Sequence, residues 1–86
     1  MSNEKLQFVI EALRELEADA QVSKNIKVRI TNTIKTLEEV SELSIRISRA
    51  LSELEEITED TNMQSFTRTQ LFNIVSMLEM MNTEQA

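Results

Sequence analysis

The sequence contains no cysteine, histidine, glycine, proline, tryptophan or tyrosine among its 86 residues. Without cysteine or histidine there is no thiolate nucleophile, no imidazole base and no soft transition-metal site, so a Ser-His-Asp triad is excluded. Without glycine there is neither a Walker A loop nor a dinucleotide fingerprint, because both bring the backbone close to phosphate at glycine positions. We therefore predict a protein that is not an enzyme and that has no cofactor or metal ion.

The same absences bear on location and on the backbone. No disulfide can form, and the start from Met1 to Lys5 lacks the basic and then apolar layout of a secretory signal. The longest uncharged run, Thr69 to Leu78, is much shorter than the roughly 20 residues that span a bilayer. These features predict a cytoplasmic protein. Turns that need positive φ are disfavoured without glycine, which favours helices joined by short polar links.

Apolar residues make up 41% of the chain and recur with the period of an α-helix. Four such stripes predict helices over about residues 4–19, 24–38, 42–59 and 64–81. Side-chain oxygens suited to capping the four helix starts are offered by Ser2 or Asn3, by Ser23, by Ser41 and by the segment Asp60-Thr61-Asn62. The predicted core positions include Leu6, Val9, Leu13, Ile26, Ile30, Ile34, Ile47, Leu54, Ile57, Leu71, Ile74, Val75 and Leu78.

The two halves of the chain match at an offset of 41 residues, the separation of Leu13 from Leu54. The register also holds through the first turn of each half, where Asp19 falls on Asp60. Two amphipathic helices can always be aligned in isolation, but a shared register across a turn also requires links of equal length. The sequence therefore predicts two similar helical hairpins.

Two hairpins of this size can bury their apolar stripes against each other. We predict a single all-α domain over residues 1–86, an antiparallel four-helix bundle with sequential helices as neighbours. The alternative is a two-unit helical repeat of the HEAT type, because the period lies in the range of such units. Solenoids of that kind usually need about three or more units to be stable, which favours the bundle.

Several stretches resemble a known family. They are the segment from Val22 to Lys27, the segment from Ile45 to Ala50, the Asp60-Thr61-Asn62-Met63 turn, and Arg68-Thr69 followed by Leu71-Phe72-Asn73-Ile74. The chain is similar over residues 22–79 to small archaeal proteins of uncharacterised protein family zero-one-four-seven. That family typically has proline where this chain has Ser23, Thr61 and Gln64, and tryptophan in place of Phe72. The resemblance implies a compact helical bundle in an archaeal cytoplasm and brings no established activity.

The second predicted helix carries only basic charges between Gln21 and Leu37. Lys24, Lys27 and Lys35 share one stripe beside its apolar face, although the whole chain has a net charge of −6. Such a stripe could bind anions, and the hypothesis that follows is an accessory factor that docks on RNA or a ribonucleoprotein. The competing interpretation is that these lysines only face water and the acidic surfaces of neighbouring helices. The absence of tyrosine and tryptophan, which stack on bases, favours this interpretation.

The fourth predicted helix has a second apolar face. Phe66, Met77 and Met80 lie roughly opposite its core stripe, and Arg68 is its only charge before Glu79. A helix that is apolar on two faces is either buried twice within the monomer or half of an interface, and methionine suits adaptable partner surfaces. Our main functional hypothesis is therefore a protein-protein interaction or scaffold module that binds a protein partner or itself through this helix. Phe8, Val28 and Ile45 also fall off their core stripes, but single exposed apolar residues are common.

Overall fold

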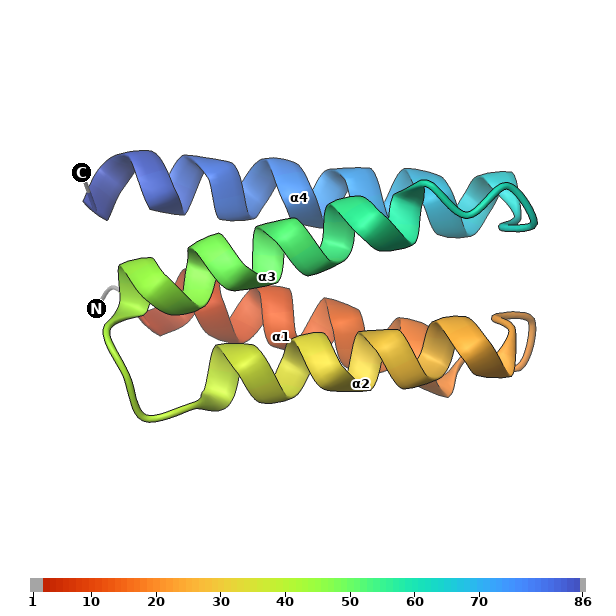
Figure 1. Ribbon diagram of the computed structural model, residues 1–86, viewed down its shortest axis with the longest axis horizontal. Helices are drawn as coiled ribbons and strands as arrows, with labels where there is room; N and C mark the ends of the chain where they lie inside the picture. Colours follow the sequence, from red (N-terminus) through yellow and green to blue (C-terminus); the bar gives the residue numbers. More distant parts are fainter. Residues whose placement is uncertain (1–2, 86) are drawn as a thin grey trace.

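The computed structural model describes residues 3–85, which form four helices in an up-down-up-down bundle (Figure 1). They are α1 (Asn3–Ala18), α2 (Lys24–Glu38), α3 (Leu43–Thr58) and α4 (Ser65–Gln85). Each helix contacts the next one along the chain, and α1 also contacts α4. This last contact closes the bundle, whereas an open two-unit solenoid would leave α1 and α4 apart. The predicted all-α four-helix bundle is confirmed.

The core is the set of stripes that the apolar periodicity predicted. Leu13, Ile30, Leu54 and Leu71, one from each helix, are completely buried, and the neighbouring stripe positions fill the space between them. Buried threonines complete the stripes. The Thr33 hydroxyl donates a hydrogen bond to the Arg29 carbonyl at 3.2 Å, so it has a partner despite its burial. No helix within residues 3–85 combines the length and the apolarity needed to cross a membrane.

The repeat extends to the hydrogen bonds of the two corresponding links. The Asp19 carboxylate accepts from the Gln21 amide at 2.8 Å, and the Asp60 carboxylate accepts from the Asn62 amide at 2.9 Å. Both aspartates also close their links through the backbone, because their carbonyls accept from the amides three residues later. The links therefore have the same conformation, as the 41-residue register predicted.

The predicted helix starts are only partly correct. Ser23 caps α2, since its hydroxyl accepts from the Ile26 amide at 3.3 Å. Ser41 does not cap α3: the capping position is Glu42, and its side chain makes no capping bond. For α1, the helix already includes Asn3, and Ser2 lies outside the described residues.

The fourth helix differs from its prediction at both ends. It begins at Ser65, and the side chain of Asp60 bonds within the preceding link instead of capping it. It also continues four residues beyond the predicted end, to Gln85. The prediction stopped at Met81 because the apolar period stops there, and that period marks only the buried part of a helix.

Candidate functional site

The boundary between α1 and α4 holds a groove with a volume of about 490 Å³, lined mostly by apolar side chains. These two helices are antiparallel neighbours that no link connects, unlike the other three neighbouring pairs (Figure 1). The apolar side chains along the groove are Phe8, Ala12, Leu16, Phe66, Ile74 and Met77. We call this feature the α1/α4 groove.

The spacing of residues along α1 and α4 explains why the lining residues of each helix lie on the same side of it. On α1, Phe8 and Ala12 are one turn apart and lie at the edge of the core stripe. On α4, Phe66 and Met77 are three turns apart on the same side of the helix, with Gln70 and Asn73 between them. The groove therefore consists of the two stripes that flank the buried stripes of α1 and α4.

The rings and the thioether at this groove differ in exposure. Phe8 and Phe66 are each 61% exposed, which is high for the largest apolar side chains of the protein. Met77 is half-buried and packs against the core. Met77 therefore lies beside the core stripe of α4. The prediction that it lies opposite that stripe, together with Phe66 and Met80, is wrong for Met77.

The structure thus brings together two of the three predicted interface residues. Phe66 and Met77 line the groove, whereas Met80 is 63% exposed and lies outside its lining. Phe8 completes the groove from α1, and sequence reasoning had treated it as an isolated exposed residue. Its one-turn spacing from the small Ala12 was the available signal, but it becomes informative only when α4 is known to be the neighbour.

The repeat provides an internal comparison for the groove. Shifting by 41 residues converts the α1/α4 boundary into the α3/α2 boundary, where a smaller hollow of about 220 Å³ lies. Its lining residues Arg29, Asn32, Glu53, Glu56 and Ile57 correspond in order to Gln70, Asn73, Ala12, Glu15 and Leu16 of the groove. The two depressions are the same place in the two halves of the repeat.

Their chemistry differs. Across the α2/α3 boundary the buried Thr36 hydroxyl donates to the Glu53 carboxylate, 3.0 Å from Oε2. The positions that correspond to this pair in the groove are Met77 and Ala12. The position that corresponds to Phe8 is Arg49, which is paired with Glu39 at 2.7 Å. A hydrogen bond and an ion pair therefore join the elements at one boundary, while large apolar side chains line the other.

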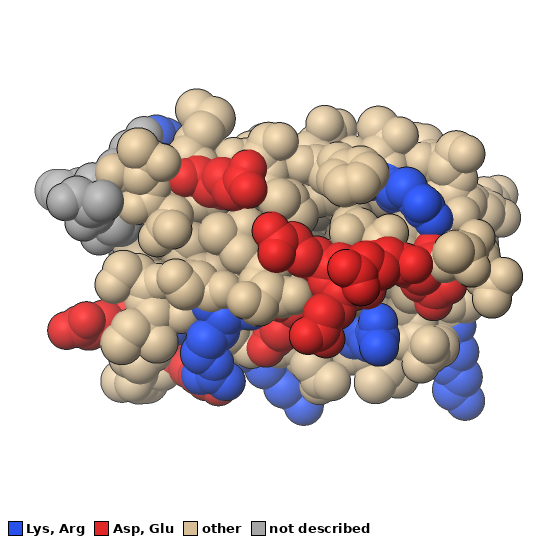
Figure 2. Space-filling view, turned by 45° about the horizontal axis from the view of Figure 1, so that its top comes forward, with Lys and Arg blue, Asp and Glu red and all other residues tan. Residues whose placement is uncertain are grey.

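Charge is distributed unevenly around the groove. Glu15 and Asp19 belong to its lining, and none of the lining residues is basic. A shallow hollow of about 350 Å³ continues it past Phe8 and Met77 to Glu4 and Lys5. On the α3/α4 side of the bundle, which Figure 2 shows, acidic side chains gather in a band over α3, whereas the surface above it, over α4, is mostly uncharged. The groove thus combines apolar side chains from both helices with carboxylates on its α1 side and amides on its α4 side.

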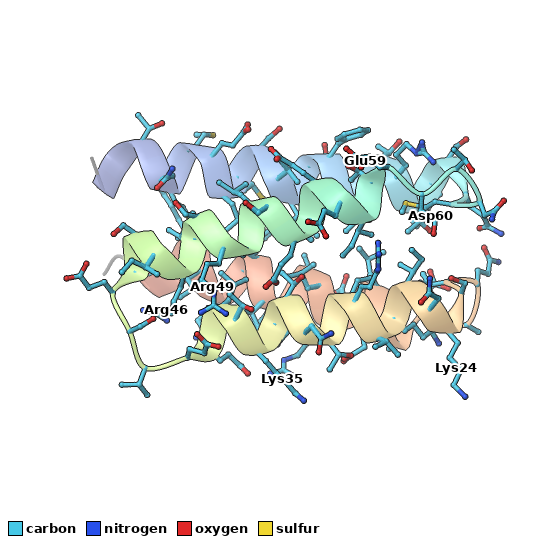
Figure 3. All side chains as sticks on the ribbon, viewed as in Figure 1. Lys24, Lys35, Arg46, Arg49, Glu59 and Asp60 are labelled. Carbon is cyan, nitrogen blue, oxygen red and sulfur yellow. The ribbon has the colours of Figure 1, made fainter. Side chains whose placement is uncertain are left out.

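The predicted basic stripe lies elsewhere. Lys24 and Lys35 are exposed and Lys27 is half-buried. Figure 3 shows Lys24 and Lys35 projecting from the outer side of α2, away from the other helices. The stripe does not reach the α1/α4 groove, so the two predicted surfaces are separate.

Acidic side chains gather at the end of the bundle that carries the two equivalent links. Glu59 and Asp60 lie there at the end of α3 (Figure 3), and Asp19 lies at the end of α1. Across residues 3–85, no group of three or more acidic side chains is arranged to hold a metal ion.

Comparison with known proteins gives two matches. A model of the family described as "Uncharacterised protein family (UPF0147)" matches residues 1–81, which is a longer stretch than the motifs alone suggested. The crystal structure of the unknown-function protein MMP1188 is similar with a TM-score of 0.83 and 39% sequence identity, over 87% of this chain and 86% of that chain. No curated protein matches with significant similarity. The fold is therefore shared along almost the whole of both chains.

Proposed function

The chain belongs to the Uncharacterised protein family (UPF0147), and we propose that it is a non-catalytic protein-interaction module that binds through the α1/α4 groove. The observation that carries this proposal is the exposure of Phe8 and Phe66, at 61% each, on opposite walls of one apolar groove. At the equivalent boundary of the other half, a hydrogen bond and an ion pair take the place of these side chains, so the bundle fold itself does not require exposed phenylalanines there. Binding of a partner protein gives a physical reason why exposed phenylalanines line the α1/α4 boundary and not the α2/α3 boundary.

The energetics of burial support the same conclusion. Fully burying a phenylalanine or methionine side chain is worth about 1.5–3 kcal/mol, and Phe8 and Phe66 still expose most of their surface to water. Contiguous exposed apolar groups with a polar surround are typical of binding surfaces in soluble proteins. The half-buried Met77 adds an adaptable side chain to the middle of the surface.

The proposal is tested by affinity capture from the native organism with matched variants of two exposed phenylalanines on α4. Phe66→Asp removes an apolar group from the groove, while Phe72→Asp changes a comparably exposed ring that does not line it. We expect a protein retained by the unmodified chain and by Phe72→Asp to be lost with Phe66→Asp. Circular dichroism establishes that both variants are folded. Identical capture by the two variants would contradict the proposal.

The same capture experiment separates the RNA hypothesis for α2. Lys24 and Lys35 are exposed, and neither forms an ion pair with any described residue, so they are accessible to phosphate. Three lysines can neutralise only a few phosphates, however, and the net charge of −6 repels nucleic acid at long range. Nuclease treatment should leave the capture unchanged. Loss of the retained protein after nuclease treatment, together with loss on charge reversal of Lys24, Lys27 and Lys35, would favour RNA docking instead.

A further inference from the structure

We infer that the occupant of the α1/α4 groove is an amphipathic helix of another protein, with lysine or arginine along the edge that faces α1. This inference rests on the proposed function and specifies its partner. It follows from the shape of the groove, from the charges on its two walls and from the net charge of the chain.

The shape fits a helix. The α1 wall extends from Phe8 to Asp19, which directly follows the end of α1 at Ala18, and these eleven steps rise about 16 Å at 1.5 Å per residue. The lining therefore matches about three turns of a helix laid along it. Helices bound in grooves insert apolar anchors at spacings of three, four and seven residues, and Phe8, Phe66 and Met77 are the apolar groups such anchors would meet.

The α1 edge of the groove is acidic. Glu4 precedes Phe8 along α1, and Glu11 and Glu15 follow it on the same side at helical spacing; all three are exposed. Glu15 lines the groove and Glu4 lines its shallow continuation. Arg14 lies on the opposite side of α1, where it pairs with Glu38 of α2 at 2.8 Å. The basic residue at the groove is Lys5, at the far end of its shallow continuation. A helix lying against this edge meets a row of carboxylates.

The α4 edge is uncharged. Arg68 is the only charged residue between Ser65 and Leu78, and its guanidinium donates to the Asp60 carbonyl at 2.7 Å, toward the preceding link. Phe66 and Asn73 succeed one another along the groove side of α4 at a seven-residue step, and Met80 lies one such step further, outside the lining. The two edges therefore call for a partner helix that is basic on one side and uncharged on the other.

A second copy of this chain does not supply such a helix. Each copy carries a net charge of −6, so two copies repel one another. The basic side of α2 offers one exposed apolar residue, Val28, among its lysines, too few for the anchors that the groove accommodates. A basic segment of a different protein is attracted by the same charge that opposes self-association.

Defined peptides test this inference on the intact protein. The probe is a peptide of about 14 residues, long enough for more than three turns, with leucine at the anchor positions, lysine along one side of them and glutamine elsewhere. One comparison peptide has glutamate in place of lysine, and another has the lysine peptide's composition in scrambled order. Binding is measured by fluorescence anisotropy at low and at high salt. We expect the ordered lysine peptide to bind at least about tenfold more tightly than either comparison peptide, with salt weakening its binding.

Two triple variants locate the charge effect. Glu4→Gln/Glu11→Gln/Glu15→Gln neutralises the α1 edge and should weaken the lysine peptide about tenfold, because complementary charge is removed beside the groove. Glu55→Gln/Glu56→Gln/Glu59→Gln removes the same charge from α3 and should leave binding within about twofold. Equal effects of the two triples, or equal binding of the scrambled peptide, would show a general attraction to an acidic protein and overturn the inference.

The remaining outcomes separate this inference from the proposed function. Tight binding of the glutamate peptide that Met77→Glu abolishes would overturn the basic partner and leave the groove as a protein-docking site. A dimer of the unmodified chain in light scattering, dispersed by Met77→Glu, would make a second copy the occupant and overturn the inference in another way. Failure of every peptide, combined with identical capture by Phe66→Asp and Phe72→Asp, would contradict the proposed function itself.

Discussion

The Thr36 hydroxyl lies 3.0 Å from the Glu53 carboxylate across the boundary of α2 and α3, and the residues at the corresponding positions of the other boundary are Met77 and Ala12. The same backbone arrangement thus carries a polar bond in one place and an apolar groove in the other. Because the repeat holds in the core and in the links, each position of one boundary has an equivalent in the other. The residues of one boundary can therefore be introduced at the equivalent positions of the other.

The first prediction concerns closing the groove. Ala12→Glu/Met77→Thr introduces at the α1/α4 boundary the glutamate and threonine that contact each other between α2 and α3. The fold already accommodates this pair at the equivalent positions of the other boundary. We expect the free energy of unfolding in urea to change by less than about 2 kcal/mol, because neither residue is in the buried core. Binding of the lysine peptide should fall by at least about tenfold, since the apolar floor is replaced. Undiminished binding by the folded double variant would place the docking surface elsewhere.

The second prediction concerns the polar bond itself. Thr36→Val keeps the shape of a buried residue but removes its hydroxyl, and it should cost about 1 kcal/mol of stability in urea unfolding. Glu53→Gln/Thr36→Val and the two single variants form a double-mutant cycle, in which a coupling of about 0.5–1.5 kcal/mol is expected for residues in contact. Additive effects would mean that the two side chains contribute independently.

Burial explains which parts of the fold were predictable. Leu13 and Leu54 are completely buried, as expected, because the apolar period records directly which side of a helix faces the core. Capping was less predictable, since Ser23 and Ser41 look alike in sequence and only Ser23 has its hydroxyl at a helix start. The link after α2 is extended through Glu39, which moves the start of α3 past Ser41 to Glu42 as its cap.

The candidate site was only half predictable for a related reason. Phe66 and Met77 are conspicuous on a nearly uncharged helix, so they could be singled out. Phe8 could not, because its significance depends on which helix lies beside that edge of α1, and the order of helices around a bundle is not contained in the period of any one helix. Whether Lys24, Lys27 and Lys35 bind an anion stays a prediction.

The third prediction uses the two similar serines. Ser23→Ala removes the acceptor for the Ile26 amide and should lower the free energy of unfolding by about 1 kcal/mol. Ser41→Ala is the matched control, an exposed serine whose side chain caps no helix, and it should stay within about 0.5 kcal/mol of the unmodified chain. Urea unfolding followed by circular dichroism measures both. Equal destabilisation by the two variants would contradict the assignment of the cap to Ser23.

The fourth prediction compares two arginines of α3 that both reach toward the end of α2 (Figure 3). The Arg46 guanidinium donates to the Leu37 carbonyl at 2.7 Å, and its Nε is buried without a partner among the described residues. Arg46→Met keeps the aliphatic part of the side chain but leaves that carbonyl without its charged donor. Because removal of the buried Nε offsets part of the loss, we expect a cost of about 1–2 kcal/mol, with little dependence on salt.

Arg49→Met tests the same kind of change at an exposed pair. Arg49 bonds to Glu39 at 2.7 Å, but the two side chains are 51% and 43% exposed, so water and salt screen their attraction. We expect a loss below about 1 kcal/mol in urea unfolding at low salt, and almost none at 1 M sodium chloride. Arg46 binds a backbone carbonyl at the end of a helix, whereas Arg49 pairs with another exposed side chain, so Arg46→Met should cost more stability than Arg49→Met although each removes one positive charge. A larger loss for Arg49→Met than for Arg46→Met would mean that surface attraction, and not the bond to the Leu37 carbonyl, holds the α2/α3 link in place.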